Sequence, residues 1–300
     1  MGEFYWYQEV LSIITKTVLI DSNAIYIKGT TPYKSIIKCA NTFDGSSAIY
    51  FKKSDSVWAN KGIGIENLTI DCNGIEIDGL KVEKAYDQTK WSNIQIENVH
   101  PNNIAFHFIQ PESSMSGEGQ TVIMENCIGL HIANNPTAPI YRFINYQEST
   151  LIGCKAFSSV ANTTTTITQG NAFEFLGCRG ITMIGCSHAF CYNGIVIKGN
   201  NRDVHGITIL GQTSEQCYGN MILTEAEGGS INGLNIYPVR HQSSGGKIML
   251  KNCNNSVIYA PTCKIELVTG IRNVIYTTDK NLIEGILPQG NSVMVTANYN

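Results

Sequence analysis

The stretch Ile65-Glu66-Asn67-Leu68-Thr69-Ile70-Asp71-Cys72-Asn73-Gly74 contains the motif that decides the fold, four residues of alternating polarity followed by a turn. The same motif recurs at Leu68-Thr69-Ile70-Asp71, Ile94-Gln95-Ile96-Glu97, Val122-Ile123-Met124-Glu125, Ser149-Thr150-Leu151-Ile152, Ile181-Thr182-Met183-Ile184, Ile207-Thr208-Ile209-Leu210 and Leu234-Asn235-Ile236-Tyr237. Most neighbouring copies begin 26 to 28 residues apart. Self-similarity at such a period is the signature of a repeat fold.

A second family of short apolar segments follows the first within each period. Its members are Leu80-Lys81-Val82-Glu83, Ile104-Ala105-Phe106-His107, Leu130-His131-Ile132-Ala133, Phe173-Glu174-Phe175, Ile195-Val196-Ile197-Lys198, Met221-Ile222-Leu223-Thr224 and Ile248-Met249-Leu250-Lys251. Segments of this length, rich in β-branched residues and separated by Asn, Gly and Ser, are typical of strands. Each repeat therefore holds at least two strands.

Successive strand residues point to opposite faces, so stacking such repeats buries every second residue, which is the apolar one. It also aligns like residues of successive repeats in ladders. We expect an all-β fold, a right-handed parallel β-helix with coils of about 22 to 32 residues. Residues 1–24 are expected to form a lead-in cap, with Glu3 to Ile20 as a helix or strand over the open end, and residues 25–300 the solenoid.

Composition narrows the classes of partner. A net charge of −3, with 15% charged residues, gives no basic footprint for nucleic acid. Apolar runs long enough to insert in a membrane are missing, as is the pattern of a signal peptide. The ten cysteines include no Cys-x-x-Cys pair, so we expect no metal site and no cofactor. Cys127, Cys154 and Cys186 share one repeat position and predict a buried thiol ladder.

Asp71, Glu97 and Glu125 occupy the same outward position of the first motif on three copies. Stacked strands lie about 4.8 Å apart, so these carboxylates are expected to form a column with the spacings that glycosidases use. Mutual repulsion should raise at least one pKa. Glu97 is expected to be the general acid, with either Glu125 or Asp71 as its partner. One acidic residue per coil is equally consistent with ordinary solvated surface.

A second candidate cluster comes from the other strand family. Glu83 and His107 share one outward position, and Lys81, His131 and Glu174 share the neighbouring one. A carboxylate and an imidazole one coil apart can exchange protons, although surface histidines often have no such role.

Three interruptions of the repeat, Gln110 to Gln120, Asn134 to Glu148 and Phe157 to Asn171, are expected to be surface loops. In or beside them, Trp91, Tyr141, Arg142 and Tyr146 are candidates for stacking on sugars or pairing with acidic groups. Packing within the loops is the alternative.

From Ile25 to the C-terminus, and most clearly at Ile65 to Gly74, the sequence resembles the pectate-lyase-like β-helix superfamily, and within it the tailspike and tail-fibre depolymerases of bacteriophages. The glycine- and aspartate-rich lead-in of such proteins, the adjacent aspartates of polygalacturonases and the calcium-binding aspartates of lyases are missing. The resemblance implies a homotrimer in a virion, made in the host cytoplasm, that binds a bacterial surface polysaccharide.

Three functions fit this pattern. The first is a depolymerase, either a glycoside hydrolase or a polysaccharide lyase. The second is a non-catalytic receptor-binding or structural tail module of the same fold. The third, a secreted enzyme that degrades plant cell walls, is disfavoured by the missing export signal and motifs. The fold does not choose among them.

Overall fold

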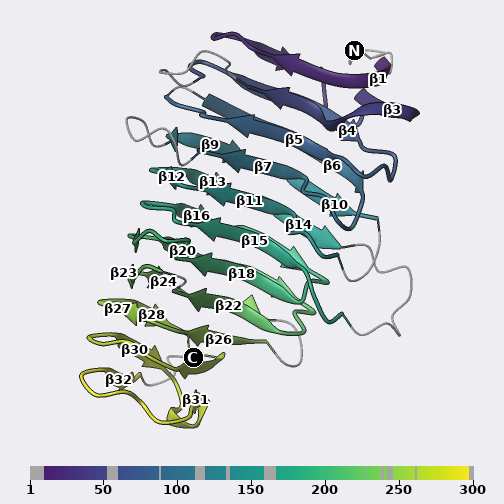
Figure 1. Cartoon of the computed structure of the whole chain (residues 1–300). Coiled ribbons are helices and arrows are strands. Elements are labelled where there is room, and N and C mark those ends of the chain that lie inside the picture. The colour runs from purple at the N-terminus through teal and green to yellow at the C-terminus, as the bar shows by residue number, and fades with distance from the viewer. Residues whose placement is uncertain are drawn as a thin grey trace, which may run out of the picture.

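The computed structural model describes residues 10–52, 60–87, 89–111, 119–132, 136–158, 167–226, 228–237, 240–241, 246–260 and 262–296. In these ranges the chain is built from strands β1 to β32 and one 3-10 turn, η1 (Lys280–Leu282). The coils stack in chain order from β1 to β32, as Figure 1 shows. The predicted all-β parallel solenoid is confirmed. None of these residues lies in a helix long and apolar enough to span a membrane.

Three sheet faces run along the stack, and all pairings between neighbouring coils are parallel. Face 1 contains β2 (Tyr26–Lys28), β9 (Val122–Glu125), β13 (Thr150–Ile152), β16 (Thr182–Ile184), β20 (Thr208–Leu210), β24 (Asn235–Ile236), β28 (Val257–Tyr259), β30 (Val274–Thr277) and β32 (Ser292–Val295). Face 2 contains β10 (Ile128–His131), β14 (Lys155–Ser158), β17 (Ser187–Ala189), β21 (Thr213–Glu215) and β25 (Arg240–His241).

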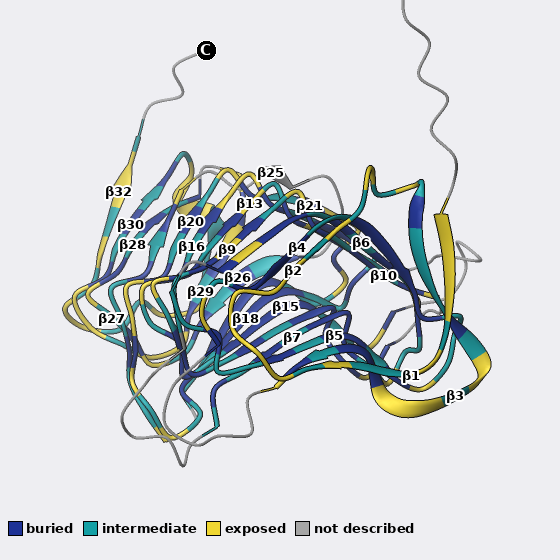
Figure 2. Cartoon of the chain, turned by 90° about the horizontal axis from the view of Figure 1, so that it is seen from above, coloured by how far each residue is buried: buried dark blue, intermediate teal, exposed yellow. Residues whose placement is uncertain are grey.

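Face 3 contains β5 (Asp78–Glu83), β7 (Phe106–Ile109), β11 (Tyr141–Ile144), β15 (Asn171–Leu176), β18 (Asn193–Lys198), β22 (Asn220–Glu225), β26 (Lys247–Leu250), β29 (Lys264–Leu267) and β31 (Ile283–Glu284). Four long strands bend from one face to the next. Of these, β4 (Gly64–Asp71) and β6 (Thr89–Val99) serve faces 1 and 2, whereas β1 (Val10–Ile20) and β3 (Ser35–Phe51) serve faces 2 and 3. Viewed along the stack, the three faces enclose the buried interior (Figure 2).

Two small parallel sheets lie between face 3 and face 1. One pairs β8 (Gly119–Gln120) with β12 (Tyr146–Gln147), and the other contains β19 (Val204–His205), β23 (Ile231–Asn232) and β27 (Cys253–Asn254). They continue the stacking through this side of each coil.

The corner between face 1 and face 2 contains a residue with positive φ on several consecutive coils. Asn67, Asn93 and Asn126 occupy it at φ 55°, 52° and 53°, and Gly153 and Gly185 follow at 61° and 58°. Asparagine and glycine tolerate this left-handed conformation better than other residues. The asparagine side chains also bond along the stack, with Asn93 Nδ2 donating to Asn67 Oδ1 at 2.9 Å. These turn residues thus explain why Asn and Gly recur at the motif.

Stacked aromatic rings fill the interior behind face 3. Phe106, Tyr141 and Phe173 form one stack, with ring centroids 4.6 and 4.7 Å apart. Tyr141 Oη is satisfied within the core, because it donates to the carbonyl oxygens of Cys127 and Lys155. A second stack contains Phe108, Phe143 and Phe175.

The predicted thiol ladder is confirmed. Register pairing places Cys127, Cys154 and Cys186 directly above one another, and all three are fully buried. Burial raises the pKa of thiols in this fold, to about 12 for Cys178, and all ten cysteines are free and buried. They act as small apolar core residues.

The predicted second strand family differs from the structure at two copies. The copy expected at Ile104 to His107 is shifted, because β7 pairs His107 with Lys81 and pairs Glu83 with Ile109, so Glu83 and His107 do not share one position as expected. The copy expected at Leu130 to Ala133 lies on another face. Ile128–His131 is β10, which pairs with β6 and β14 on face 2. The face 3 strand of this coil is Tyr141–Ile144, within the segment predicted to be a loop, and it pairs with β7 and β15. Because strand residues alternate between faces, His131 consequently points into the core and is 1% exposed.

The N-terminal end of the described chain is β1, which lies parallel to β3 along faces 2 and 3. Several of its apolar residues, including Val10 and Ile13, are exposed. The expected boundary between a cap of residues 1–24 and the solenoid stays a prediction.

Acid should destabilise the fold through His131. Burial lowers its pKa to about 4, although a 2.8 Å hydrogen bond with the Asn103 carbonyl opposes the shift. The unfolded chain binds a proton below about pH 6.5, whereas the folded chain does not until about pH 4. We expect His131 to account for a loss of about 3 kcal/mol in the free energy of unfolding across this interval.

Urea unfolding at pH 7 and pH 4.5 would measure the effect. His131→Gln should flatten the pH dependence, while His205→Gln, at an exposed histidine, should leave it unchanged. The same decrease in the wild type and in His131→Gln would contradict the assignment.

Candidate functional site

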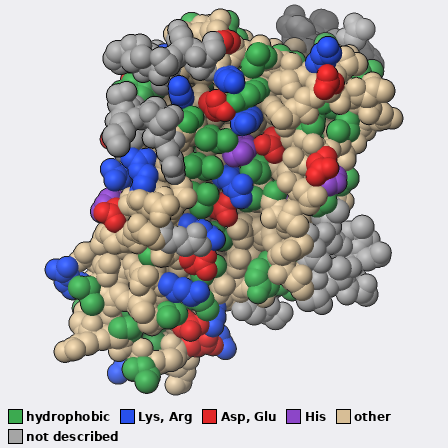
Figure 3. Space-filling model, viewed as in Figure 1, with side chains coloured by type: hydrophobic (Ala, Val, Ile, Leu, Met, Phe, Trp, Pro, Cys, Tyr) green, Lys and Arg blue, Asp and Glu red, His purple; other side chains and the backbone are tan. Residues whose placement is uncertain are grey.

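Face 3 carries a column of five chemically distinct side chains on consecutive coils. Register pairing aligns Tyr50, Lys81, His107, Arg142 and Glu174. All five alternate with buried aromatic or aliphatic residues, which forces them to the outer side of the sheet. In Figure 3, charged side chains of both signs run down the middle of this face. The column is the centre of the candidate site.

The first part of the site is a cluster around Glu83. Tyr50 Oη donates a hydrogen bond to the Glu83 carboxylate. Lys81 Nζ lies 3.7 Å from the same carboxylate and 4.8 Å from the centroid of the Tyr50 ring. Burial and then the Glu83 hydrogen bond raise the pKa of Tyr50. Tyr50 therefore stays protonated and orients a carboxylate that is also held by an ammonium group.

The second part is a carboxylate–imidazole pair. Asp78 Oδ2 lies 2.7 Å from His107 Nδ1, and Asp78 Oδ1 accepts from the backbone N–H of Ile104. Burial would raise the pKa of Asp78, but the hydrogen bonds and the charge of His107 outweigh it and lower the pKa. The ionised carboxylate fixes the ring with Nδ1 as donor. His107 Nε2 lies beneath the surface without a hydrogen-bond partner among the described residues.

The third part is an ion pair that continues into an amide ladder. Arg142 Nε donates to Glu174 Oε2 at 2.5 Å, and Asn171 Nδ2 donates to the other oxygen at 3.2 Å. Asn193 donates to Asn171 at 3.0 Å and accepts from Asn220 at 3.2 Å. Polar groups thus extend from the column over the next two coils.

The predicted acidic column is correct for two of its three members. Asp71 and Glu97 are register partners on face 2. The expectation for Glu125 is wrong, since it pairs with Ser92 on face 1 and follows that residue by 33 positions. The coil that ends at β9 is longer than the period of 26 to 28 residues, and its extra residues shift Glu125 out of register with Glu97. Glu125 therefore does not extend the Asp71–Glu97 pair.

Asp71 is held by the protein itself. Its carboxylate accepts hydrogen bonds from Lys38 Nζ at 2.7 Å, and from Asn98 Nδ2 and the Asn73 backbone N–H at 2.8 Å each. Burial would raise its pKa, but these donors outweigh it and lower the pKa. The expected repulsion from Glu97 thus does not raise the pKa of Asp71. Glu97 is half-buried and accepts from Gln95 at 2.5 Å.

Three aromatic residues predicted at the surface are core residues. Trp91, Tyr141 and Tyr146 are all 0% exposed, which excludes stacking on a surface ligand. Trp91 packs edge-on against Phe51 and Phe108. His131 is buried too, so of the expected substrate-binding residues only Glu83, His107 and Arg142 meet on face 3. Asp78 and Tyr50 were not anticipated, because their partners lie 29 and 33 residues away.

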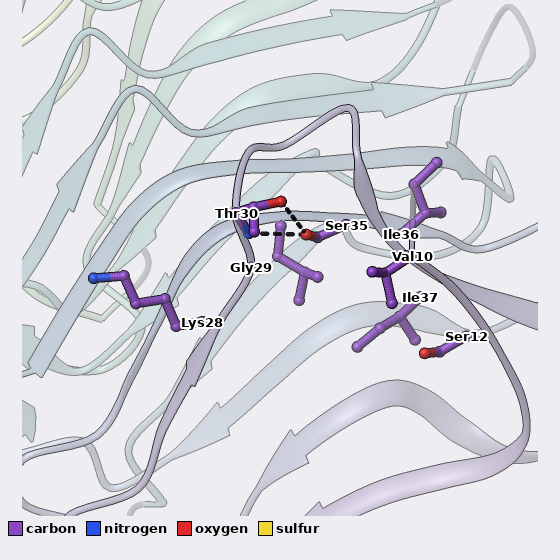
Figure 4. Close-up of a pocket in the computed structure, with 9 residues that line it drawn as sticks. Val10, Ser12, Lys28, Gly29, Thr30, Ser35, Ile36 and Ile37 are labelled. Carbon is purple, nitrogen blue, oxygen red and sulfur yellow. Dashed lines mark hydrogen bonds between the residues drawn. The ribbon is translucent and has the colours of Figure 1, made fainter. Parts of the chain in front are cut away.

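An open pocket of about 270 Å³ lies at the N-terminal end, beside β1, β2 and β3 (Figure 4). It is lined by Val10, Ser12, Lys28, Gly29, Thr30, Ser35, Ile36, Ile37 and Leu68. Ser35 Oγ accepts from the Thr30 backbone N–H at 2.9 Å and closes the turn that borders it. The lining combines four aliphatic side chains with four polar ones and contains no acid–base pair. Among the described residues there is also no group of three or more side chains suited to a metal ion.

No family model matches this sequence, and no curated protein matches it. Solved structures do. The A-module of the mannuronan C-5 epimerase AlgE6 of Azotobacter vinelandii is similar with a TM-score of 0.62 at 12% identity, over 96% of this chain and 90% of that module. The Dettilon tailspike protein gives 0.62 at 10% identity, over 94% of this chain and 61% of its own.

The gp42 tailspike of an Acinetobacter phage gives a TM-score of 0.53 at 11% identity, over 94% of this chain and 51% of its own length. This chain thus spans about half to three fifths of those two tailspikes. At such identities the likeness concerns the fold. It confirms the right-handed parallel β-helix that the repeat predicted.

Replacing Asp71 tests whether this carboxylate is structural. Asp71→Asn removes a negative charge that Lys38 and two N–H donors surround, and we expect it to lower the free energy of unfolding by about 1 to 3 kcal/mol at pH 7. The loss should shrink as the pH falls through the lowered pKa of Asp71, because the wild type then loses the same charge.

Chemical denaturation at pH 7 and pH 3 measures both effects. Glu97→Gln is the matched control, and a change within about 0.5 kcal/mol is expected there. Equal stability of Asp71→Asn and the wild type at pH 7 would rule out the structural role.

Proposed function

We propose that this chain, which has the right-handed parallel β-helix fold of the pectate-lyase-like superfamily, binds an extended bacterial surface polysaccharide along face 3 and cleaves it there. The observation that carries the proposal is the column of Tyr50, Lys81, His107, Arg142 and Glu174, five consecutive coils of polar chemistry on one open face. A long face suits a polymer better than a small metabolite. The similar structures of tailspikes and of an enzyme acting on mannuronan support a glycan ligand.

Glu83 and His107 are our candidates for the acid–base pair. They are diagonal neighbours on adjacent coils, a relation that places backbones about 7 to 8 Å apart. Inverting glycosidases hold their two carboxyl groups about 6.5 to 9.5 Å apart so that a water fits between, and in our proposal an imidazole takes the place of the acidic carboxyl group. Glu83 would activate that water, and His107, oriented by Asp78, would protonate the leaving oxygen. His107 Nε2 lies just beneath the surface and has no hydrogen-bond partner in the described part of the chain, and catalytic contacts often form only in the complex.

The alternative is a receptor-binding module without catalysis. It is favoured by the number of charged groups on face 3 that already bond to protein neighbours, such as Arg142 to Glu174. The expected pair of Glu97 and Asp71 on face 2 stays a second proposal for a catalytic centre.

Matched carboxamide variants separate these proposals. Glu83→Gln and His107→Gln should each lower reducing-end release from a cleaved bacterial polysaccharide by about 100-fold or more, the usual effect of losing a general acid or base. Binding should be retained within a few-fold. Glu97→Gln, on the neighbouring face, is the control and should keep full release.

The opposite result, release lost in Glu97→Gln alone, would move the catalytic centre to face 2. A wild type that binds glycans and releases no ends from any of them would establish the receptor-binding module instead.

A homotrimeric virion protein, the assembly of a phage tail, is the form that we propose for the functional molecule. An uncharged outward row on face 1 supports association with copies of itself. Its residues are Ile152, Ile184, Leu210, Tyr237, Tyr259, Tyr276 and Met294. Ile184, Tyr237 and Met294 are 39%, 40% and 47% exposed. Because the row contributes one residue per coil, a copy rotated about a parallel axis would meet it with the same spacing.

Charge placed in this row should prevent assembly. The mass in solution, from light scattering, is expected to be three times the 32.9 kDa of the chain for the wild type and that of one chain for Ile184→Asp. Ile286→Asp, at an exposed isoleucine outside the row, is the control. A wild-type monomer, or a trimer that tolerates Ile184→Asp, would exclude this row as the interface.

A further inference from the structure

The charges of face 3 point to the class of glycan that it takes. We infer that the polysaccharide is uncharged, a chain of neutral or N-acetylated sugars without carboxylate, sulfate or phosphate groups. This inference rests on the proposed function, since it concerns the ligand of the same face.

Each Lys or Arg in strands β5 to β31 of face 3 has a carboxylate within 4 Å. The pairs are Lys81 with Glu83, Arg142 with Glu174, Lys198 with Glu225, Lys247 with Glu266 and Glu284, and Lys264 with Glu284. Lys251, the residue after β26, shares Glu225 at 3.6 Å. The cations of strands β5 to β29 are therefore already paired with carboxylates.

Acidic residues slightly outnumber basic residues in the strands of face 3. Strands β5 to β31 of face 3 contain five Lys or Arg residues and six Asp or Glu residues. The sixth carboxylate, Asp78, is matched by His107. Over the length of these strands a polyanion would meet at least as many negative as positive groups, so it would gain no net attraction.

Breaking these pairs for a charged sugar would also be costly. Arg142 and Glu174 have side chains only 29% and 7% exposed, and a sugar carboxylate that took the guanidinium would leave Glu174 as an unpaired, nearly buried charge. Removing one partner of such a pair costs several kcal/mol. A hydroxyl group, in contrast, donates to the carboxylate and accepts from the cation without separating them.

The amide ladder of Asn171, Asn193 and Asn220 fits the same ligand. It places one carboxamide at the start of each of β15, β18 and β22, on the coils that also carry Glu174, Lys198 and Glu225. Carboxamides donate and accept hydrogen bonds without charge, which matches sugar hydroxyl and acetamido groups.

An uncharged ligand also restricts the chemistry. β-Elimination needs a proton acidified by the carboxyl group of a uronic acid, which a neutral sugar lacks. Cleavage on face 3 would then be hydrolysis: the bond from C1 to the bridging oxygen breaks, the oxygen of a water bonds to C1, one proton of that water passes to Glu83, and His107 protonates the leaving oxygen.

The first experiment compares matched polymers. Acidic bacterial polysaccharides and their carboxyl-reduced derivatives, which differ only in having hexose in place of uronic acid, are titrated against the wild type together with a panel of neutral capsules. We expect binding to be confined to neutral polymers, or at least tenfold tighter to the reduced form, and to change little between 50 and 500 mM salt.

Tighter binding of the native acidic polymer, lost at high salt, would overturn this inference and leave glycan binding intact. Binding to none of the polymers would instead reject the proposed function, and this inference with it.

A charge variant tests the same point without the natural ligand. Glu225→Gln removes the carboxylate shared by Lys198 and Lys251, and it should be retained on immobilised dextran sulfate at a salt concentration at which the wild type passes through. Glu148→Gln makes the same change of net charge at an exposed position outside face 3. Strong retention of the wild type, or equal retention of the two variants, would contradict the neutralised face.

Discussion

Backbone hydrogen bonds between parallel strands of successive coils determine every neighbour relation in this molecule. Each coil can contact only the coils beside it, so the register of those bonds decides which side chains meet. The pairing of Lys81 with His107, and of His107 with Arg142, brings together residues that lie far apart in the chain. The same register places Cys127 above Cys154 and Phe106 above Tyr141. The fold and the candidate site are therefore two consequences of one constraint.

The sequence predicted the strands well because alternation and turn residues are local signals. Apolar residues at every second position, with Asn or Gly at a corner such as Asn93, can be recognised without knowing the partner strand. Register across a long connection is not local. The motifs at Leu68 and Ile94 belong to face 2, whereas the similar motif at Val122 belongs to face 1. A long strand such as β6 pairs on face 1 in one part and on face 2 in another, and the same sequence pattern fits both faces.

Errors of register change chemistry as well as position. A shift of one residue in a strand exchanges its inner and outer side chains. Such a shift in the predicted strand is why the buried His131 was expected at the surface. The predicted surface position of Tyr141 was wrong for a related reason. A segment rich in Pro, Tyr and Arg is typical of a loop. In the structure, however, Tyr141 and Phe143 alternate with Arg142 along a strand and pack in the core between the rings of neighbouring coils. Asp78 and Tyr50 could be recognised only once their partners were known.

Two aspartates, the buried Asp71 and the half-buried Asp78, show why the environment of a carboxylate matters more than its place in a repeat. Asp71 and Asp78 both have lowered pKa values despite burial. The carboxylate oxygens of Asp71 accept hydrogen bonds from a lysine, a side-chain amide and a backbone N–H, none of which exchanges protons near neutral pH. Asp78 bonds instead to an imidazole, the side chain suited to that exchange. A carboxylate that only closes a corner and one that orients a proton carrier therefore differ in their partners, and the proton carrier is the one that lies among the paired charges of face 3.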